Sequence, residues 1–274
     1  MPKIQGSAAI LLAALLWSSG GLFIKWIPLS ELAVAGGRAT VTALFYLAIL
    51  RPNLRRARLS TALAYAGMIL TFVAANKRTT AASAVLLQYT GTAWVLIAGH
   101  RLFGEKVTKV DILAVIGCLF GMALCLLDDT AGITWQGNAL GAISGVFFAC
   151  AVLLMRRDAQ HGLESAQASI TLGNLLAAVF GLSLAGSELA HGLHMRAGLG
   201  LLWLGLMQMG AAYLLFLRGL RTVTASTASL LSLLEPAVSP IWVWLGTGER
   251  PGLATLAGGA LMLGSLAARA IRQR

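Results

Sequence analysis

Long apolar runs follow one another along nearly the whole chain, separated by short polar connections. Ten of these runs are about as long as the ~20 residues that an α-helix needs to cross a bilayer. Their approximate ends are 4–26, 33–51, 60–77, 80–101, 109–127, 137–156, 166–187, 198–217, 224–246 and 252–271. A membrane-spanning β-strand would instead alternate apolar and polar residues over about ten positions. The pattern therefore predicts an all-α integral membrane protein with ten transmembrane helices.

The second half of the chain repeats features of the first. Residues 84–106, AVLLQYTGTAWVLIAGHRLFGEK, align with residues 228–250, ASLLSLLEPAVSPIWVWLGTGER, at a shift of 144. A smaller shift places Trp17 on Phe148. Five helices per half is an odd number, so the second half would enter the membrane from the opposite side. We therefore expect two inverted five-helix repeats, residues 1–130 and 134–274, an architecture that many secondary transporters share.

Charged residues make up 11% of the chain, against about 25% in a typical soluble protein. The net charge of +11 arises from Lys and Arg in the connections between the apolar runs, so we expect the lipid bilayer and not a nucleic acid as the partner of these residues. If the N-terminus is cytoplasmic, 15 Lys and Arg residues fall in cytoplasmic segments and 5 fall outside. This asymmetry predicts that both termini are cytoplasmic. We expect the protein to lie in a bacterial inner (plasma) membrane. The outer pair Lys77 and Arg78 fits this topology least well.

One predicted helix carries an acid and two prolines near its centre. Within SLLSLLEPAVSPIWVWLG, residues 229–246, a polar stripe follows the helical spacing of three and four and comprises Ser232, Glu235, Ser239, Trp242 and Gly246. Pro236 and Pro240 have no amide hydrogen, so two backbone carbonyls one turn earlier lose their helical partners. Such groups are costly to expose to lipid. We therefore expect this stripe to face the bundle interior or a polar cavity.

Glu235 has two interpretations at this point. It either binds the amino group of a substrate or carries a proton, or it is a structural acid paired with a residue such as Arg38. Arg38 lies early in its helix, so it is a structural or pairing residue, or it extends its long side chain to the membrane interface. Pro236 and Pro240 are assigned structural roles in the same region.

Further polar and aromatic residues near the middle of the predicted helices are candidates for the same cavity. Gln88 aligns with Ser232 in the repeat, and Tyr89 lies beside it. Trp17 is suited to stacking on an aromatic or apolar substrate. The full candidate substrate-binding set is Trp17, Gln88, Tyr89, Asn174, Gln208, Ser232, Glu235 and Trp242. For each of them, packing or hydrogen bonding between helices is the alternative interpretation.

Taken together, these features resemble EamA-type members of the drug/metabolite transporter superfamily. The resemblance is carried by AALLWSSGGLFIK in the first helix, by Arg38, and by the endings LFGEK and GTGER after the fourth and ninth helices. TTAASAVLLQYT and TASTASLLSLLEP resemble the amino-acid exporter branch, including aromatic amino-acid exporters of the YddG kind. Thr92 departs from the family pattern, which usually has a proline there, so a bend in the fourth helix is less expected than one in the ninth.

Motifs of ATP-driven proteins and of common hydrolases do not occur in the sequence. GHRLFGEKV, residues 99–107, has two glycines of a P-loop, but Glu105 interrupts the motif and no Ser or Thr follows Lys106. Neither H-E-x-x-H nor G-x-S-x-G occurs, and the three cysteines form no C-x-x-C motif. We therefore expect no enzymatic activity, no cofactor, no metal site and no direct use of ATP.

The resemblance implies a secondary transporter that works by alternating access and exports small metabolites, with neutral or aromatic amino acids as the leading cargo. A monomer is one admissible oligomeric state. Drugs or lipophilic cations are the alternative cargo, because an acid and tryptophans would bind them equally well. A non-transporting membrane scaffold or sensor is an alternative from another class of protein.

Overall fold

All regular structure in the described part of the chain is helical. The computed structural model describes residues 2–127, 134–247 and 252–272, and these residues contain no β-strand. The first half comprises α1 (Pro2–Trp17), α2 (Gly20–Trp26), α3 (Glu31–Ile49), the short 3₁₀ turn η1 (Leu54–Arg56), α4 (Leu59–Arg78), α5 (Ala81–Tyr89), α6 (Gly91–Phe103) and α7 (Lys109–Cys125). The second half comprises α8 (Trp135–His161), α9 (Leu163–Gly192), α10 (Met195–Trp203), the π-helical segment η2 (Leu204–Ala211), α11 (Ala212–Leu220), α12 (Ala225–Ser232), α13 (Leu234–Thr247) and α14 (Leu253–Arg272).

Each predicted span corresponds to one helix or to consecutive helical segments in line. Among the described residues, nine such helices are long and apolar enough to cross a membrane, as expected of a multi-pass membrane protein. The remaining predicted span is α7, which has 17 residues. At about 1.5 Å per residue, α7 is ~25 Å long, somewhat shorter than a hydrocarbon core of ~30 Å. The predicted boundary at residue 130 and the Glu249–Arg250 end of GTGER lie outside the described residues.

The two halves of the chain pack through matching helix pairs. The second and seventh spans, α3 and α9, pack along one another, as do the fifth and tenth, α7 and α14. The third span α4 packs on the sixth span α8, and the first span α1 packs on the eighth span through α11. If the two halves are exchanged, the pairs α3–α9 and α7–α14 map onto themselves, and the pair of the third and sixth spans maps onto the pair of the eighth and first. This relation is expected of a two-repeat architecture.

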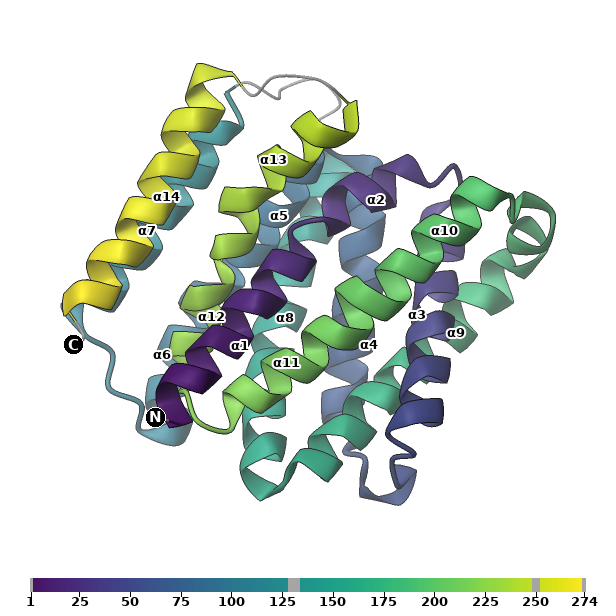
Figure 1. Cartoon of the computed structure of the whole chain (residues 1–274), viewed down its shortest axis with the longest axis horizontal. Coiled ribbons are helices and arrows are strands. Elements are labelled where there is room, and N and C mark those ends of the chain that lie inside the picture. The colour runs from purple at the N-terminus through teal and green to yellow at the C-terminus, as the bar shows by residue number, and fades with distance from the viewer. Residues whose placement is uncertain (1, 128–133, 248–251, 273–274) are drawn as a thin grey trace.

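The path of the chain agrees with an even number of crossings. Figure 1 shows that α1 begins and α14 ends at the lower left of the molecule, on the same side as the connections α3–α4, α8–α9 and α11–α12. In the same view α7 and α14 lie side by side at the left edge, next to the remaining bundle.

Four spans are divided part of the way along their length, and a further span, the seventh, is kinked within α9 at Ala185, where φ is −132° and ψ is 15°. The breaks separate α1 from α2 at Ser18 and Ser19, α5 from α6 at Thr90, and α12 from α13 at Leu233, while η2 interrupts the eighth span. The Thr90 hydroxyl donates to Leu87 O at 2.5 Å, and the next bond is a tight one from Ala93 N to Thr90 O. The hydrogen-bond pattern of the fourth span therefore changes at Thr90 without a proline at Thr92, while the backbone of Thr90 keeps right-handed helical angles.

Matching threonines start the two spans that the internal repeat aligns best. Thr80 accepts a hydrogen bond from Ser83 N at the start of α5, and Thr224 accepts one from Thr227 N at the start of α12. Each side-chain oxygen thereby satisfies an amide group that has no partner within its own helix. The two caps are 144 residues apart, the same shift that aligns the sequences.

Glycines set the closest approach between helices, notably between α3 and α9. A Cβ atom at Gly181 would lie 2.7 Å from Gly36 Cα and 2.8 Å from Leu32 O, which are backbone atoms that cannot rotate away. We expect Gly181→Ala to lower the melting temperature of the detergent-solubilised protein, because overpacking costs about 1–3 kcal/mol.

Gly198→Ala in α10 is the matched control for this substitution. Nothing lies within 4 Å of a Cβ atom at Gly198, so the change should be neutral or stabilising through its higher helix propensity. Equal melting temperatures for the two variants would contradict the close contact between α3 and α9.

Candidate functional site

A small cavity lies where the interrupted spans of both halves meet. Its volume is about 30 Å³, room for one or two water molecules. Side chains from α1, α3, α4, α5, α8, η2, α11 and α13 enclose it, namely Trp17, Arg38, Met68, Ile69, Phe72, Gln88, Tyr89, Phe148, Gln208, Met209, Tyr213 and Glu235. Two groups of opposite charge, several amide and hydroxyl groups, and an aromatic wall thus surround one point in the bundle.

Glu235 reaches the cavity from the first turn of α13. Its side chain is buried, and Tyr89 Oη donates a hydrogen bond of 2.6 Å to Glu235 Oε2. The unpaired amide groups at the start of a helix favour an acid at this position. Pro236 follows within the first turn, where a missing amide hydrogen removes no helical bond, so the chain restarts its helix here with the acid directed inward.

Arg38 faces the same cavity from α3. It is only 1% exposed, and its Nη1 donates to Gln208 Oε1 at 3.2 Å, while its Nε is buried without a hydrogen-bond partner among the described residues. Extension of Arg38 to the membrane interface was therefore wrong, because the side chain turns toward the bundle centre. Glu235 and Arg38 line one cavity without forming an ion pair, although five ion pairs join other described residues.

An aromatic wall extends from the cavity into the second half of the chain. The ring of Trp17 lies 4.8 Å from that of Tyr213 and 5.1 Å from that of Phe216, measured between centroids. Tyr65 packs edge-on against Tyr213, also at 4.8 Å. Trp17 Nε1 and Tyr65 Oη are buried without hydrogen-bond partners in the described part of the chain, which leaves polar atoms within an otherwise apolar wall.

Gln88 also reaches the cavity, where Phe148 packs beside Tyr89. Gln88 Nε2 donates to Ser144 Oγ at 3.0 Å, which anchors the amide to α8. The rings of Tyr89 and Phe148 are 5.4 Å apart between centroids. Of the predicted substrate-binding residues, the structure therefore brings Trp17, Gln88, Tyr89, Gln208 and Glu235 together.

Three other predicted residues lie elsewhere. Ser232 Oγ donates to Ala228 O within its own helix, and Asn174 Nδ2 donates to Ile170 O in the same way. Trp242 Nε1 donates to Ser18 Oγ at 2.7 Å, which ties α13 to the break between α1 and α2. Ser232 is separated from the rest of its stripe because α12 ends before Leu233, and the later stripe residues pack on the first span.

Five apolar residues of the cavity were not predicted. They are Met68, Ile69, Phe72, Phe148 and Met209. An apolar residue that lines a cavity cannot be distinguished by its type from the other apolar residues of the same span. The sequence therefore offers only one signal for these five residues, the internal repeat. Phe148 aligns with Trp17 in that repeat, and both line the cavity, one from each half.

Polar contacts close the bundle at the end where the connections α2–α3 and α4–α5 lie. Lys25 Nζ donates to Thr79 O at 2.7 Å, and Lys77 Nζ donates to Ile27 O at 2.6 Å, so the ends of the first and third spans bind one another reciprocally. Arg78 forms an ion pair with Glu31 at the start of α3. The basic pair that fitted the topology least well therefore has specific partners in the structure.

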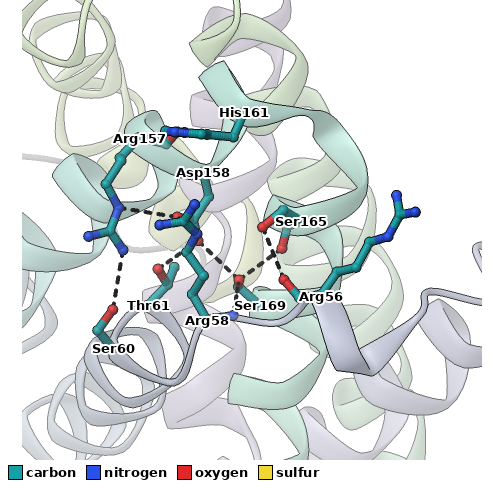
Figure 2. Close-up of polar contacts among 9 residues, drawn as sticks. All are labelled: Arg56, Arg58, Ser60, Thr61, Arg157, Asp158, His161, Ser165 and Ser169. Atoms are coloured by element: carbon teal, nitrogen blue, oxygen red, sulfur yellow. Dashed lines mark hydrogen bonds and ion pairs between the residues drawn. The ribbon is translucent and has the colours of Figure 1, made fainter.

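A second polar network closes the opposite end, around the buried Asp158 near the end of α8. Figure 2 shows Thr61, Ser169 and Arg58 directed at the Asp158 carboxylate from neighbouring segments. Thr61 Oγ1 donates to Asp158 Oδ2 at 2.7 Å and Ser169 Oγ donates to the same oxygen at 3.0 Å. Arg58 and Arg157 each place a nitrogen 3.4 Å from Asp158 Oδ1. One carboxylate thus joins α4, α8 and α9.

Glu105 provides a further link on this side of the molecule. Its carboxylate accepts hydrogen bonds from Ala225 N at 2.8 Å, Ser226 N at 3.0 Å and Ser226 Oγ at 2.7 Å, at the start of α12. The acid of LFGEK therefore caps a helix of the other half. Within the described residues, no three His, Cys, Asp or Glu side chains gather as metal ligands would.

Comparisons with known proteins agree with this architecture. The EamA-like transporter family matches the chain twice, over residues 4–127 and 135–268. An uncharacterized transporter of Archaeoglobus fulgidus is 30% identical over 269 residues, which cover 94% of this chain and 93% of that protein. A protein of known crystal structure has a TM-score of 0.78 at 18% identity, over 97% of this chain and 96% of that one. At this identity the structural likeness concerns the fold alone.

Proposed function

The chain belongs to the EamA-like transporter family, and on this premise we propose that it is a secondary transporter that exports neutral or aromatic amino acids across a bacterial inner membrane. The observation that supports this cargo is that Glu235 and Arg38 both line one cavity beside an aromatic wall. A zwitterion places an ammonium and a carboxylate on the same carbon, and a cavity with an acid and a guanidinium offers a partner to each.

In this proposal each end of the substrate has a named partner. Glu235 accepts hydrogen bonds from the substrate ammonium, and Arg38 donates to the substrate carboxylate, with Gln208 holding the guanidinium in place. Trp17 and Tyr213 lie against the substrate side chain. Arg38, for which the sequence suggested a structural or pairing role, thereby becomes a substrate-binding residue, whereas the Asn174 side chain bonds its own helix.

The cavity of about 30 Å³ corresponds to a closed state, since sites that hold small molecules have volumes of roughly 300 Å³ or more. We propose that the two halves rock against one another, so that contacts between the halves at one end, such as that of Thr79 with Asn138, open in one state and those at Asp158 open in the other. In the same proposal α7 is the tenth transmembrane helix, both termini are cytoplasmic, and the working unit is a monomer without enzymatic activity or ATP.

Transport by the purified protein in liposomes tests this function. We expect uptake of radiolabelled Phe above that of protein-free liposomes, measured with and without a pH gradient. Phenethylamine, which lacks the carboxylate, is the matched probe for the alternative of amine or lipophilic-cation transport. Arg38→Gln should reduce Phe uptake more than phenethylamine uptake, because only Phe has a carboxylate for Arg38.

The result that would overturn the proposal is uptake of phenethylamine but of no amino acid, by protein shown to be folded. That outcome would favour export of drugs or lipophilic cations. An absence of flux for amino acids, amines and drugs alike would favour a scaffold or sensor.

A further inference from the structure

A second hollow of the molecule lies between α6 and α7 and shares no lining residue with the central cavity. It has a volume of about 520 Å³ and is lined by apolar side chains along most of its length, among them Leu96, Ile97, Ile112 and Ile116. Ile97, Ile112 and Ile116 are 50%, 49% and 57% exposed, so the groove opens to the surroundings of the bundle. We refer to it as the α6–α7 groove.

The α6–α7 groove arises because the two helices barely touch. In the second half of the chain, α13 and α14 hold the corresponding places and pack directly against one another. α7 is attached mainly to α14, with smaller contacts to α5 and α12. The α7–α14 pair is therefore held to the rest of the bundle on one side, and the groove separates it from α6 on the other.

Basic residues lie at one end of the groove and in the connection that follows it. Arg101 lines the groove itself, and Lys106 and Lys109 follow in the connection to α7 and at its first residue. All three are exposed, and none has a hydrogen bond or ion pair from its side chain to a described residue. His100 also lines this end, with Nδ1 2.9 Å from Glu105 O.

The nearby acids do not neutralise these cations, because each is engaged elsewhere. Glu105 is buried and accepts three hydrogen bonds from the start of α12. Asp111 accepts from Thr108 N at 2.8 Å and from Arg269 Nε at 2.7 Å. Arg101 in the lining of the groove, and Lys106 and Lys109 next in the chain, are therefore three exposed cations without an acidic partner among the described residues, beside an apolar channel.

We propose that the α6–α7 groove binds one anionic phospholipid, with an acyl chain along the groove and the phosphate at Arg101, Lys106 and Lys109. An amphipathic molecule with an anionic head matches both the apolar walls and the charged end. Basic pockets between transmembrane helices bind acidic lipid headgroups in this manner. The lipid fills the space that side chains fill between α13 and α14, and so holds the α7–α14 pair to the bundle.

Native mass spectrometry of the detergent-solubilised protein tests this site. Phosphatidylglycerol and phosphatidylcholine with identical acyl chains are titrated against the wild type and against the triple variant Arg101→Gln, Lys106→Gln, Lys109→Gln. We expect the wild type to bind phosphatidylglycerol more tightly, and the triple variant to lose affinity for it by about 100-fold, since each cation near an anionic group contributes roughly fivefold.

The matched control is the triple variant Arg55→Gln, Arg218→Gln, Arg221→Gln, which removes the same net charge from exposed positions that do not line the groove. Ile116→Trp fills the groove without changing its charge and should weaken the binding of phosphatidylglycerol. Retention of lipid does not require transport, so a failure here and a failure of the proposed function are separable.

Four outcomes of the lipid titrations would overturn the proposal. They are equal binding of the two lipids by the wild type, equal losses in both triple variants, unchanged binding in Ile116→Trp, and competition by inorganic phosphate as effective as by the lipid. The last would indicate an anion site without an acyl chain. A groove occupied by a second copy of the chain would appear as dimers that exclude the lipid, which also contradicts the proposal.

Discussion

Replacing Glu235 with Gln should reduce amino-acid transport in liposomes by roughly two orders of magnitude. The carboxylate is the acid that lines the central cavity, and a hydrogen bond to a charged group inside a protein contributes about 1.5–3 kcal/mol. Gln keeps the size of the side chain and an acceptor for Tyr89, but it carries no charge for an ammonium group and holds no transferable proton. The measurement is initial uptake of radiolabelled Phe as a function of external pH.

Two variants separate this effect from damage to the fold. Tyr89→Phe removes the donor of the 2.6 Å bond to Glu235 and leaves the acid in place, so transport should fall only severalfold. Trp242→Phe removes a hydrogen bond from the same helix outside the cavity and should leave the affinity for Phe unchanged. If Glu235→Gln transports as the wild type does, with the same pH dependence, Glu235 is a structural acid and the assignment to substrate fails.

The spans and the internal repeat could be predicted because both depend on the composition of the sequence and on the spacing of its residues. Apolar length identified the helices, and the shift of 144 residues aligned Thr80 with Thr224, which cap equivalent helices. The cavity itself continues this symmetry through its apolar lining. Met68 and Met209 are 141 residues apart, and so are Phe72 and Tyr213, with one member of each pair in each half. A comparison of the halves position by position would have identified these residues.

The polar residues of the cavity could be predicted only in part. Helical spacing shows which side chains share one face of a helix, but it does not show which neighbouring helix that face contacts. Asn174 and Ser232 bond the preceding turn of their own helices, an alternative open to any short polar side chain within a helix. Arg38 turned inward because Gln208 offers an acceptor there, and the π-helical segment that carries Gln208 has no signal in the sequence. Long-range partners of this kind depend on how the two halves meet.

The polar groups also break the symmetry that the apolar lining keeps. Arg38 comes from the first half and Glu235 from the second, at positions that the repeat does not relate, so the cavity has a positive and a negative side. A site with two different ends can orient a zwitterion, whereas a fully symmetric site would treat both ends alike. Closure of the bundle, by contrast, is carried by separate networks at the two ends of the spans, and these can be tested one at a time.

Replacing Asp158 with Ala should destabilise the protein more than any other change at that end of the bundle. The carboxylate is buried and joins α4, α8 and α9 through Thr61, Ser169 and two arginines. Removing it leaves hydroxyls and guanidinium groups without their acceptor. Because the arginine side chains are 40% and 35% exposed and can turn to water, the loss is about 2 kcal/mol and below that of a fully buried pair. This corresponds to a melting temperature lower by roughly 5 °C, measured in detergent.

Glu164→Gln is the control that the same interface provides. Glu164 pairs with Arg56 between α9 and η1, but its side chain is 50% exposed and that of Arg56 is 60% exposed. An exposed ion pair contributes at most about 1 kcal/mol, so this variant should melt close to the wild type. Asp158→Asn should fall between them, since it keeps an oxygen for Thr61 and Ser169 and loses the charge that binds Arg58 and Arg157. If Asp158→Ala and Glu164→Gln melt at the same temperature, the Asp158 network does not hold this end of the bundle closed, and its opening is no step of the transport cycle.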